Sequence, residues 1–580
     1  MKFKLGGHRC KASCSTASTT QSISLLQPWV RSAQGLVWSL TAVALGWVGT
    51  LPAVGAEQVT LRLGPFEQAI AISDLERFAK TGELPGGLQP LAPVLTLQVR
   101  EVLNRSLQID PNIADKLIED VLRSPTGKQL IRSLEVAIPN SSIEQLQAAV
   151  SLAARQANGL SLVGFLRAYP QENITLDASS AVALALQFNP SYWQSQALGP
   201  LLERDLAVKS NTPFKAAFDP ALPGSQTVQQ QTLFLQDRQR HRTIPVDLYF
   251  PKQEETSSSP LASRLPLVVI SHGFGANRKF FAYLARHLAS HGLTVAALEH
   301  PGSNIKRSLS VSGVNNPGKL LPATEFIDRP LDVSFVLDQL AKLDQQPGLL
   351  QGKLNTQQVS AIGHSLGGYT TLALAGGEVN LEELRQFCKG STPIGQAPGD
   401  WLQCAAADLP QRKLQLRDQR VKSVIAFNPL VGKLFGNGLT QVTIPVLLLA
   451  GTEDTITPAL DNQLRPFTQL RSPKYLLTAI GGTHLSISDP TNITSTNNQS
   501  TFDKERQGEE AKYLRQLVQG VSLAFIKQLT PEAKTYEPFL TPAYAQSFSK
   551  SQLPLRLNTE LPASITPWIE VVGKPSPQLR

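Results

Sequence analysis

Apolar residues follow two different patterns along this chain. Within 57–190 they recur three or four positions apart, for example in 113–122 and 143–150, which is the spacing of one face of an α-helix. From about residue 231 they form short uninterrupted runs separated by helical patterns. Runs of this kind are typical of strands that are buried on both faces of a parallel sheet. The pattern therefore predicts a smaller all-helical region, 57–190, ahead of a larger α/β region.

The α/β region is expected to span 231–530. Its predicted strands are 244–250, 265–270, 293–298, 359–362, 423–427, 444–450 and 475–479, and its predicted helices include 280–289, 331–343 and 509–529. This alternation indicates a doubly wound, mostly parallel sheet, which carries its functional loops at the carboxyl ends of the strands. Proline-rich stretches on either side predict a connector at 191–230 and a tail at 531–580.

A short stretch in this region has the form of a nucleophile elbow. The predicted strand 359–362 leads into Gly363-His-Ser365-Leu-Gly367, and a helical pattern follows. Strand, sharp turn and helix, in that order, are what such an elbow requires. Gly363 and Gly367 leave room for a turn in which a Cβ atom would collide with neighbouring backbone. The pattern predicts that Ser365 is a nucleophile held in a strained backbone conformation.

Ser365 requires a base, and the base requires an acid to orient it, because a serine hydroxyl is a poor nucleophile at neutral pH. In this class of sheet the chain order is serine, acid, histidine. Only one of the eight histidines, His484, follows Ser365, so it is the predicted base. Asp454 directly follows the predicted strand 444–450 and is the predicted acid, with its neighbour Glu453 as the alternative.

Two backbone amides are expected to stabilise the oxyanion of the tetrahedral intermediate. The first is the N–H of Leu366, the residue after the nucleophile. The second is the N–H of Phe274, in the glycine-containing loop 271–275 that follows a predicted strand. His272 and His364 flank these turns and are predicted to brace them, without a part in proton transfer.

Composition narrows the class of protein. A chain of 580 residues with 42% hydrophobic content can bury more than one core. The net charge is +9, but residues 1–56 alone hold five basic and no acidic residues. The remainder has no dense Lys/Arg run with interleaved aromatic residues, so no nucleic-acid partner is expected.

Residues 1–56 have the features of an export signal. A basic region precedes the apolar run 36–48, and Val54-Gly-Ala56 is a small-residue cleavage site. The apolar run is short for a spanning helix, and glycine and proline interrupt its surroundings. The sequence predicts a signal peptide and export to the periplasm or the exterior, with an uncleaved membrane anchor as the alternative.

Two cysteines remain beyond that segment. Cys388 and Cys404 are 16 positions apart, and in an oxidising compartment they would form a disulfide, with two unrelated buried thiols as the alternative. Neither belongs to a zinc-type spacing, and no metal or cofactor is expected. Both lie in 377–420, a long segment after the elbow helix. This segment is predicted to be a cap or lid over the acyl site, with a surface excursion that does not contact substrate as the alternative.

The motifs His272-Gly-Phe-Gly275 and Gly363-His-Ser-Leu-Gly367 together resemble those of α/β-hydrolases. They are similar to the platelet-activating-factor acetylhydrolase and dienelactone-hydrolase-like branches, over roughly 230–530. The helical region resembles an uncharacterised domain found ahead of cyanobacterial hydrolases. The resemblance implies the α/β-hydrolase fold and an esterase activity. In the acetylhydrolases the acid follows the strand after the elbow helix, and here Asn428 stands at that place, so Asp454 takes the role.

The sequence thus predicts an exported serine hydrolase of carboxylic esters. Its expected partner is a small-molecule or lipid ester with an apolar acyl group, and contact with a membrane surface is compatible with such a substrate. A peptidase or thioesterase on the same scaffold is one alternative, because a fold does not determine its substrate. A catalytically inert binding or scaffold protein of the envelope is the other.

Overall fold

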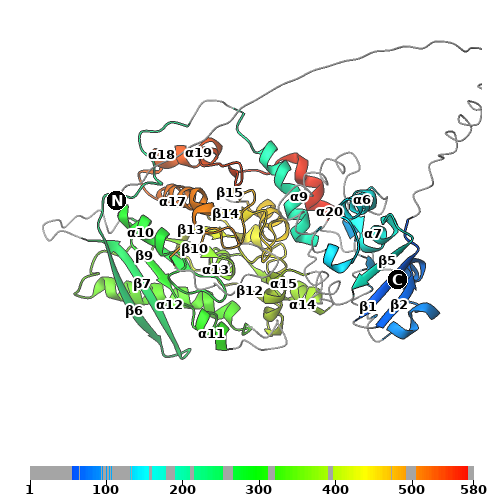
Figure 1. Cartoon of the computed structure of the whole chain (residues 1–580). Helices are drawn as coiled ribbons and strands as arrows, with labels where there is room; N and C mark the ends of the chain where they lie inside the picture. The colour runs from blue at the N-terminus through cyan, green and yellow to red at the C-terminus, as the bar shows by residue number, and fades with distance from the viewer. Residues whose placement is uncertain are drawn as a thin grey trace, which may run out of the picture. The chain divides into compact units, whose positions relative to one another are not determined.

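The computed structural model describes most of the chain from residue 55 to residue 571. The residues not described within this span are 64–65, 93–94, 96–99, 101–102, 105, 108–130, 132–133, 156–159, 178–189, 210–213, 253–264, 311–320, 390–395, 472 and 492–504. The chain divides into two units, Met1–Val54 and Gly55–Arg580, and the second contains every described residue (Figure 1). The predicted signal peptide, apart from its last two residues, and the apolar stripe 113–122 lie outside the described residues.

A nine-stranded sheet forms the centre of the α/β region, in the order β16-β15-β14-β13-β10-β8-β9-β7-β6. The strands from β15 to β9 in this order are parallel, while β6, β7 and β16 pair in the antiparallel sense at the two edges. This architecture confirms the predicted α/β class. The strands are β6 (Val228–Asp237), β7 (Arg242–Pro251), β8 (Leu267–Ser271), β9 (Val295–Leu298), β10 (Val359–His364), β13 (Val421–Phe427), β14 (Val446–Gly451), β15 (Lys474–Ala479) and β16 (Leu555–Asn558).

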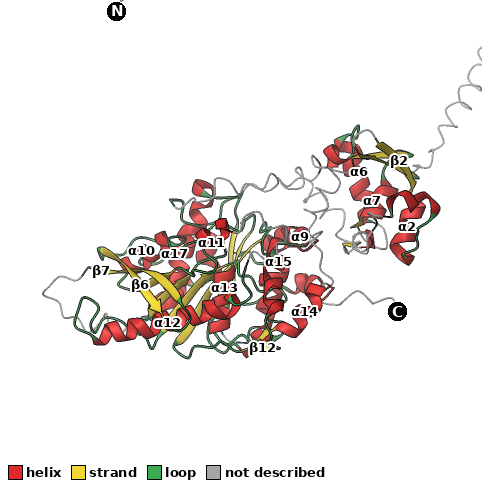
Figure 2. Ribbon diagram, turned by 90° about the horizontal axis from the view of Figure 1, so that it is seen from below, coloured by secondary structure: helices red, strands yellow, loops and turns green. Residues whose placement is uncertain are grey.

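Helices cover both faces of this sheet (Figure 2). On one face α12 (Glu325–Gln345) and α13 (Leu366–Leu374) pack against alternate strand residues such as Val269 and Ala361. On the other face α10 (Ala282–Ser290) and α17 (Lys512–Lys527) pack against the residues between them. Because both faces are buried, the central strands are apolar throughout, which is why their sequences do not alternate. No helix in the described part of the chain is long and apolar enough to cross a membrane.

Residues 55–177 contain strands as well as helices, which corrects the expectation of an all-helical region. The strands β1 (Gln58–Leu63), β2 (Phe66–Ala71) and β5 (Asn173–Asp177) form a three-stranded sheet in the order β2-β1-β5. Its first two strands form an antiparallel hairpin, whereas β5 joins β1 across more than 100 residues. A pairing this distant leaves no signal in a local pattern. The helices of this region include α2 (Ile72–Thr81), α6 (Ile143–Ala154) and α7 (Leu162–Ala168), and α6 contains the predicted stripe 143–150.

The borders of the α/β region also differ from the prediction. Within the expected connector, α9 (Pro190–Asp205) is a helix whose Ser195 Oγ accepts the N–H of Leu460, at 2.9 Å. Proline at the first position of a helix costs little, so Pro190 begins this helix and does not mark a boundary. The expected tail supplies β16, which pairs with β15 at the edge of the main sheet. The α/β region therefore includes both segments.

The predicted cap, 377–420, is folded against the α/β region. It contains α14 (Leu381–Lys389) and α15 (Pro398–Cys404), together with a two-stranded sheet of β11 (Val379–Asn380) and β12 (Lys413–Leu414). A disulfide joins Cys388 of α14 to Cys404 of α15. The two cysteines are 16 residues apart, and closing a loop of this length stabilises a fold by roughly 3 kcal/mol, because it lowers the conformational entropy of the unfolded chain. The cross-link therefore fixes the two helices of the cap to each other.

Candidate active site

Ser365 lies in a strained turn between β10 and α13. Its backbone has φ 55° and ψ −120°, a conformation that costs a residue with a Cβ atom roughly 1–3 kcal/mol. The flanking glycines make the turn possible. A Cβ atom on Gly363 would lie 2.0 Å from the carbonyl oxygen of Gly367, and one on Gly367 would lie 2.0 Å from that of Ser271. The elbow thus closes on itself and on the end of β8, at two points where only glycine fits.

The neighbouring strand holds this conformation in place. The N–H of Ser365 donates to the carbonyl of Phe427, at 3.0 Å, and the N–H of Leu430 donates to the carbonyl of Ser365, at 2.9 Å. Both partners belong to β13 or the loop directly after it. Because the backbone is fixed on both sides of the serine, the position of its Cβ atom is also fixed.

Asp454 follows β14 and is completely buried. Its Oδ1 accepts the N–H groups of Ile456 and Thr457, at 2.9 and 2.7 Å. Its Oδ2 accepts the side-chain amide of Asn428 and the hydroxyl of Thr457, at 2.6 and 2.9 Å. A buried carboxylate requires such donors to offset its lost hydration, and here they leave the carboxylate in one orientation.

His484 is hydrogen-bonded to that carboxylate and lies beside the elbow. Its Nδ1 is 2.8 Å from Oδ2 of Asp454. His364, the residue before Ser365, donates from Nε2 to the carbonyl of His484, at 2.9 Å, and the two imidazole rings are 4.5 Å apart. Ser365 and His484 are each 5% exposed, so both are almost completely buried.

The electrostatic surroundings favour the protonated form of His484. Burial alone lowers the pKa of its imidazole, but the charge and hydrogen bond of Asp454 and the charge of Glu505 outweigh burial and raise that pKa above its usual value. The Oε2 atom of Glu505 accepts the N–H of Leu485, at 3.0 Å. Sequence reasoning missed Glu505 because it follows the histidine by about 20 residues in a polar stretch without a motif.

The predicted oxyanion loop passes directly over the serine. A Cβ atom on Gly273 would lie 3.2 Å from Cβ of Ser365 and 3.1 Å from Nδ1 of His364, so this backbone approaches the elbow closely. Phe274 is the next residue of the loop. Leu366 is the first residue of α13, where N–H groups have no partner within the helix. Among the described residues, no group of three or more His, Cys, Asp and Glu side chains could hold a metal ion.

Comparisons with known proteins agree with this architecture. The family described as "Platelet-activating factor acetylhydrolase, isoform II" matches residues 225–312, which include β8 and the loop 271–275 that follows it. The family described as "Alpha/beta hydrolase of unknown function (DUF1400)" matches residues 55–177. The chain has the α/β-hydrolase fold.

Two platelet-activating factor acetylhydrolases are similar to part of this chain. The protein of Cavia porcellus is 28% identical over 144 residues, and that of Canis lupus familiaris is 28% identical over 147 residues. Each match covers 20% of this chain and 33% of the relative. The chain therefore spans about a third of the length of these curated relatives, and the match is shorter than the stretch 230–530 over which the motifs resemble that family.

Asn428 lies directly after β13, beside the buried carboxylate of Asp454. It follows β13 with φ 42°, and its side chain donates to the buried carboxylate of Asp454. The residue that stands where the resemblance implies an acid therefore donates to the carboxylate that follows the next strand, β14. The alternative acid, Glu453, is 4.0 Å from Nη2 of Arg506, while Asp454 is the residue hydrogen-bonded to His484.

The strain at the elbow predicts an unusual order of stabilities. The free energy of unfolding of Ser365→Gly should be about 1 kcal/mol higher than that of Ser365→Ala. Glycine relieves roughly 1–3 kcal/mol of backbone strain in the folded state, and this exceeds the 0.4–1 kcal/mol that it costs by adding conformational entropy to the unfolded chain. Denaturant unfolding of both variants measures the difference. At an unstrained position the alanine variant would be more stable than the glycine variant. If Ser365→Ala is the more stable of the two, the backbone at Ser365 is not strained.

Proposed function

We propose that this α/β-hydrolase is a serine esterase that cleaves carboxylic esters through Ser365, His484 and Asp454. The observation that carries the proposal is the 2.8 Å hydrogen bond from His484 to a buried aspartate, formed beside a strained serine elbow. The three residues follow β10, β14 and β15, at the carboxyl edge of one parallel sheet. Ligand sites in open α/β sheets lie at that edge.

The proposed reaction proceeds through an acyl-enzyme. Nε2 of His484 takes the proton of Ser365 as Oγ attacks the acyl carbon, and Asp454 stabilises the imidazolium that forms. The N–H groups of Phe274 and Leu366 donate to the oxyanion. The alcohol leaves with the proton from His484. Water then attacks the acyl carbon, His484 takes its proton, and the acid departs while the proton returns to Ser365.

An apolar acyl ester of short to medium chain is the proposed substrate. The relatives are acetylhydrolases by name, which supports a small acyl group. The cap contacts the loop that carries the acid, because the N–H of Gly399 donates to the carbonyl of Ile456, at 2.9 Å. A Cβ atom on Gly399 would lie 3.1 Å from Leu430, whose own N–H bonds the backbone of Ser365. We propose that the cap forms part of the acyl site.

Export is also part of this proposal. It rests on the basic and apolar character of residues 1–56 and on the disulfide between Cys388 and Cys404. Disulfides persist in oxidising compartments and are rare in the cytosol of most organisms. A small-molecule or lipid ester outside the cytosol is the substrate class that follows.

Turnover of p-nitrophenyl acetate, butyrate and octanoate tests the proposal. Wild-type protein should hydrolyse the shorter esters. His484→Ala should lower kcat by about 10⁴-fold or more, because it removes the base, and Asp454→Asn should cost about 10⁴-fold. His291→Gln is the matched control, since this imidazole bonds only the carbonyl of Leu222 among the described contacts and should keep full activity. Near-normal turnover by His484→Ala would remove the proposed base.

The same assay separates the alternatives. Peptide anilides and acyl thioesters of matched chain length should be cleaved more slowly than the oxygen esters. A preference for either would favour a peptidase or a thioesterase. Absence of all turnover by folded wild-type protein would favour an inert scaffold.

The pH dependence of kcat/KM follows from the raised pKa of His484. The imidazole must be neutral to act as base, so activity falls as the pH drops through that pKa, and the acid limb should lie above about 6.5, the usual histidine value. Glu505→Gln removes one of the charges that raise the pKa and should move the limb to lower pH. Glu509→Gln, at a side chain that is 85% exposed, should leave the limb in place. A limb that does not move in Glu505→Gln would contradict this assignment.

A further inference from the structure

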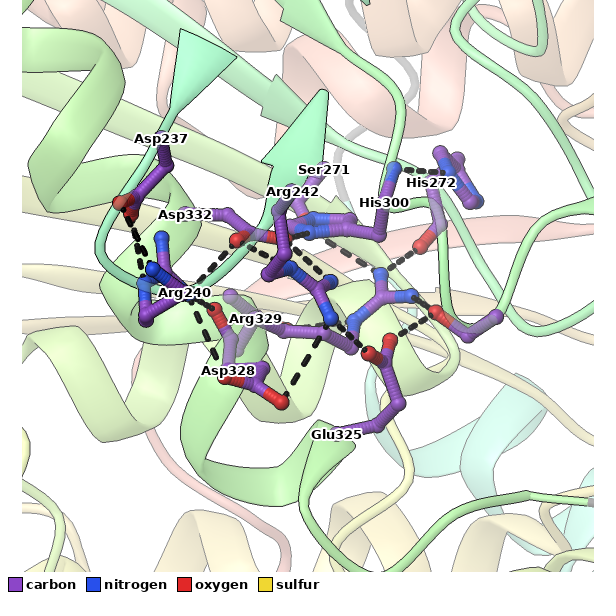
Figure 3. Close-up of polar contacts among 12 residues, drawn as sticks. Asp237, Arg240, Arg242, Ser271, His272, His300, Glu325, Asp328, Arg329 and Asp332 are labelled. Atoms are coloured by element: carbon purple, nitrogen blue, oxygen red, sulfur yellow. Dashed lines mark hydrogen bonds and ion pairs between the residues drawn. The ribbon is translucent and has the colours of Figure 1, made fainter. Parts of the chain in front are cut away.

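A cluster of buried charged and polar side chains lies next to the oxyanion loop (Figure 3). Arg329, on α12, is at its centre and is completely buried. Its guanidinium donates from Nε to Thr370 Oγ1, at 3.1 Å, and from Nη1 to Ser303 Oγ, at 2.6 Å. Its Nη2 donates to Ser271 Oγ, at 3.2 Å, and to the carbonyl of His272. One side chain thus joins α13, the loop after β9 and the end of β8.

Two of these three elements lead into or carry the proposed oxyanion donors. The carbonyl of His272 belongs to the peptide that directly precedes Gly273–Phe274. On the other side, Thr370 Oγ1 accepts from Arg329 and donates to the carbonyl of Leu366, at 3.0 Å. The guanidinium is therefore in contact with the Phe274 loop and, through one hydroxyl, with the first turn of α13.

The chemistry of arginine fixes the direction of the neighbouring hydrogen bonds. A guanidinium only donates, so Ser271 Oγ accepts from Arg329, and its own hydrogen is directed to Nε2 of His300, at 2.9 Å. Nδ1 of His300 then donates to Asp332, at 3.0 Å. Burial, together with the positive charges of Arg329 and the arginines on β7 and its turn, holds the pKa of His300 well below its usual value, which keeps this ring neutral.

The same network orients the peptide that carries the Phe274 N–H. Nε2 of His272 accepts the backbone N–H of His300, at 3.0 Å, so its Nδ1 carries the hydrogen and donates to the carbonyl of Gly273, at 2.7 Å. The Gly273 carbonyl and the Phe274 N–H are parts of one planar peptide. Holding the carbonyl therefore fixes the direction of the N–H.

Packing alone does not require a cation at this position. Apolar residues of similar volume commonly replace buried ion pairs without loss of stability. Burial lowers the pKa of Arg329 to about 10, while the carboxylates of Glu325 and Asp332 raise it, so the side chain stays charged at neutral pH. What an arginine adds here is a rigid fork of donors, aimed at one carbonyl and three hydroxyls.

We propose that Arg329 is a positioning residue for ester hydrolysis, which sets the spacing between the Phe274 and Leu366 amides. The inference rests on the proposed function, since only the oxyanion of that reaction gives the spacing a role. Donors fixed before the reaction stabilise developing charge without reorganisation, and a displacement of about 1 Å costs up to about 10²-fold in rate.

The test compares Arg329→Lys with wild-type full-length enzyme on p-nitrophenyl butyrate. Lysine keeps the charge but cannot reach all four acceptors from one ammonium group. We expect kcat to fall by about 10- to 100-fold with KM within about threefold. The inhibition constant of a butyl trifluoromethyl ketone, which forms a tetrahedral oxyanion on the serine, should rise by the same factor as the loss in kcat/KM.

Arg420→Lys is the matched control. This arginine is partly buried and contacts α12, the helix of Arg329, because it bonds the carbonyl of Ser334. Its ionic partners are Asp418 and Asp338, away from the loop of Phe274. Arg420→Lys should lower the midpoint of thermal unfolding and leave kcat and the inhibition constant of the ketone unchanged.

Thr370→Val provides the test if Arg329→Lys does not fold, because this substitution removes the link to the Leu366 carbonyl and leaves Arg329 in place. We expect it to lower kcat by about tenfold.

The two proposals can fail separately. Suppose that the wild-type enzyme hydrolyses the ester and that the folded Arg329→Lys or Thr370→Val variant has the wild-type kcat and the wild-type inhibition constant of the ketone. Arg329 then has no positioning role. A loss of kcat without a matching loss of ketone affinity would also overturn the inference. Absence of turnover by the wild-type enzyme would instead contradict the esterase proposal and, with it, this one.

Discussion

The close approach of the serine elbow to the end of β8 is the constraint on which the rest of the site depends. Gly363 meets the backbone of Gly367, Gly367 meets that of Ser271, and Gly273 lies against the serine itself. These contacts hold Ser365 at a positive φ and bring the loop of Phe274 over its side chain. A Cβ atom on Gly363 would collide within the elbow, and one on Gly367 would push the elbow away from the end of β8, so this arrangement requires both glycines.

The sheet then supplies the remaining groups in the order of its strands. β13, β14 and β15 lie side by side, and the residues that follow them are Asn428, Asp454 and His484. Each group orients the next, because Asn428 donates to Asp454, which in turn accepts from His484. On the other side of the elbow, Arg329 fixes the turns that follow β8 and β10. Positions far apart in the sequence thus form two sets of hydrogen bonds, one on each side of the elbow.

The sequence predicted the parts of this arrangement that have local signals. Strands buried on both faces appear as apolar runs, the elbow has a motif, and His484 is the only histidine after it. The strand pairing of β1 with β5 and the edge strand β16 were missed because both depend on partners distant in sequence. Arg329 and Glu505 were missed for a related reason. A lone charged residue in a helical or polar stretch is usually at the surface, and only tertiary contacts reveal a buried one.

The most direct test of the account is the site at which a fluorophosphonate reacts with the folded protein. The chain contains a second row of the same residue types, Ser271, His300 and Asp332, but that serine is 1% exposed and accepts a hydrogen bond from Arg329. Peptide mass spectrometry should find one adduct, on Ser365, that is lost in Ser365→Ala and after denaturation. An adduct on Ser271, or folded wild-type protein that remains unlabelled, would contradict the assignment of Ser365 as the nucleophile.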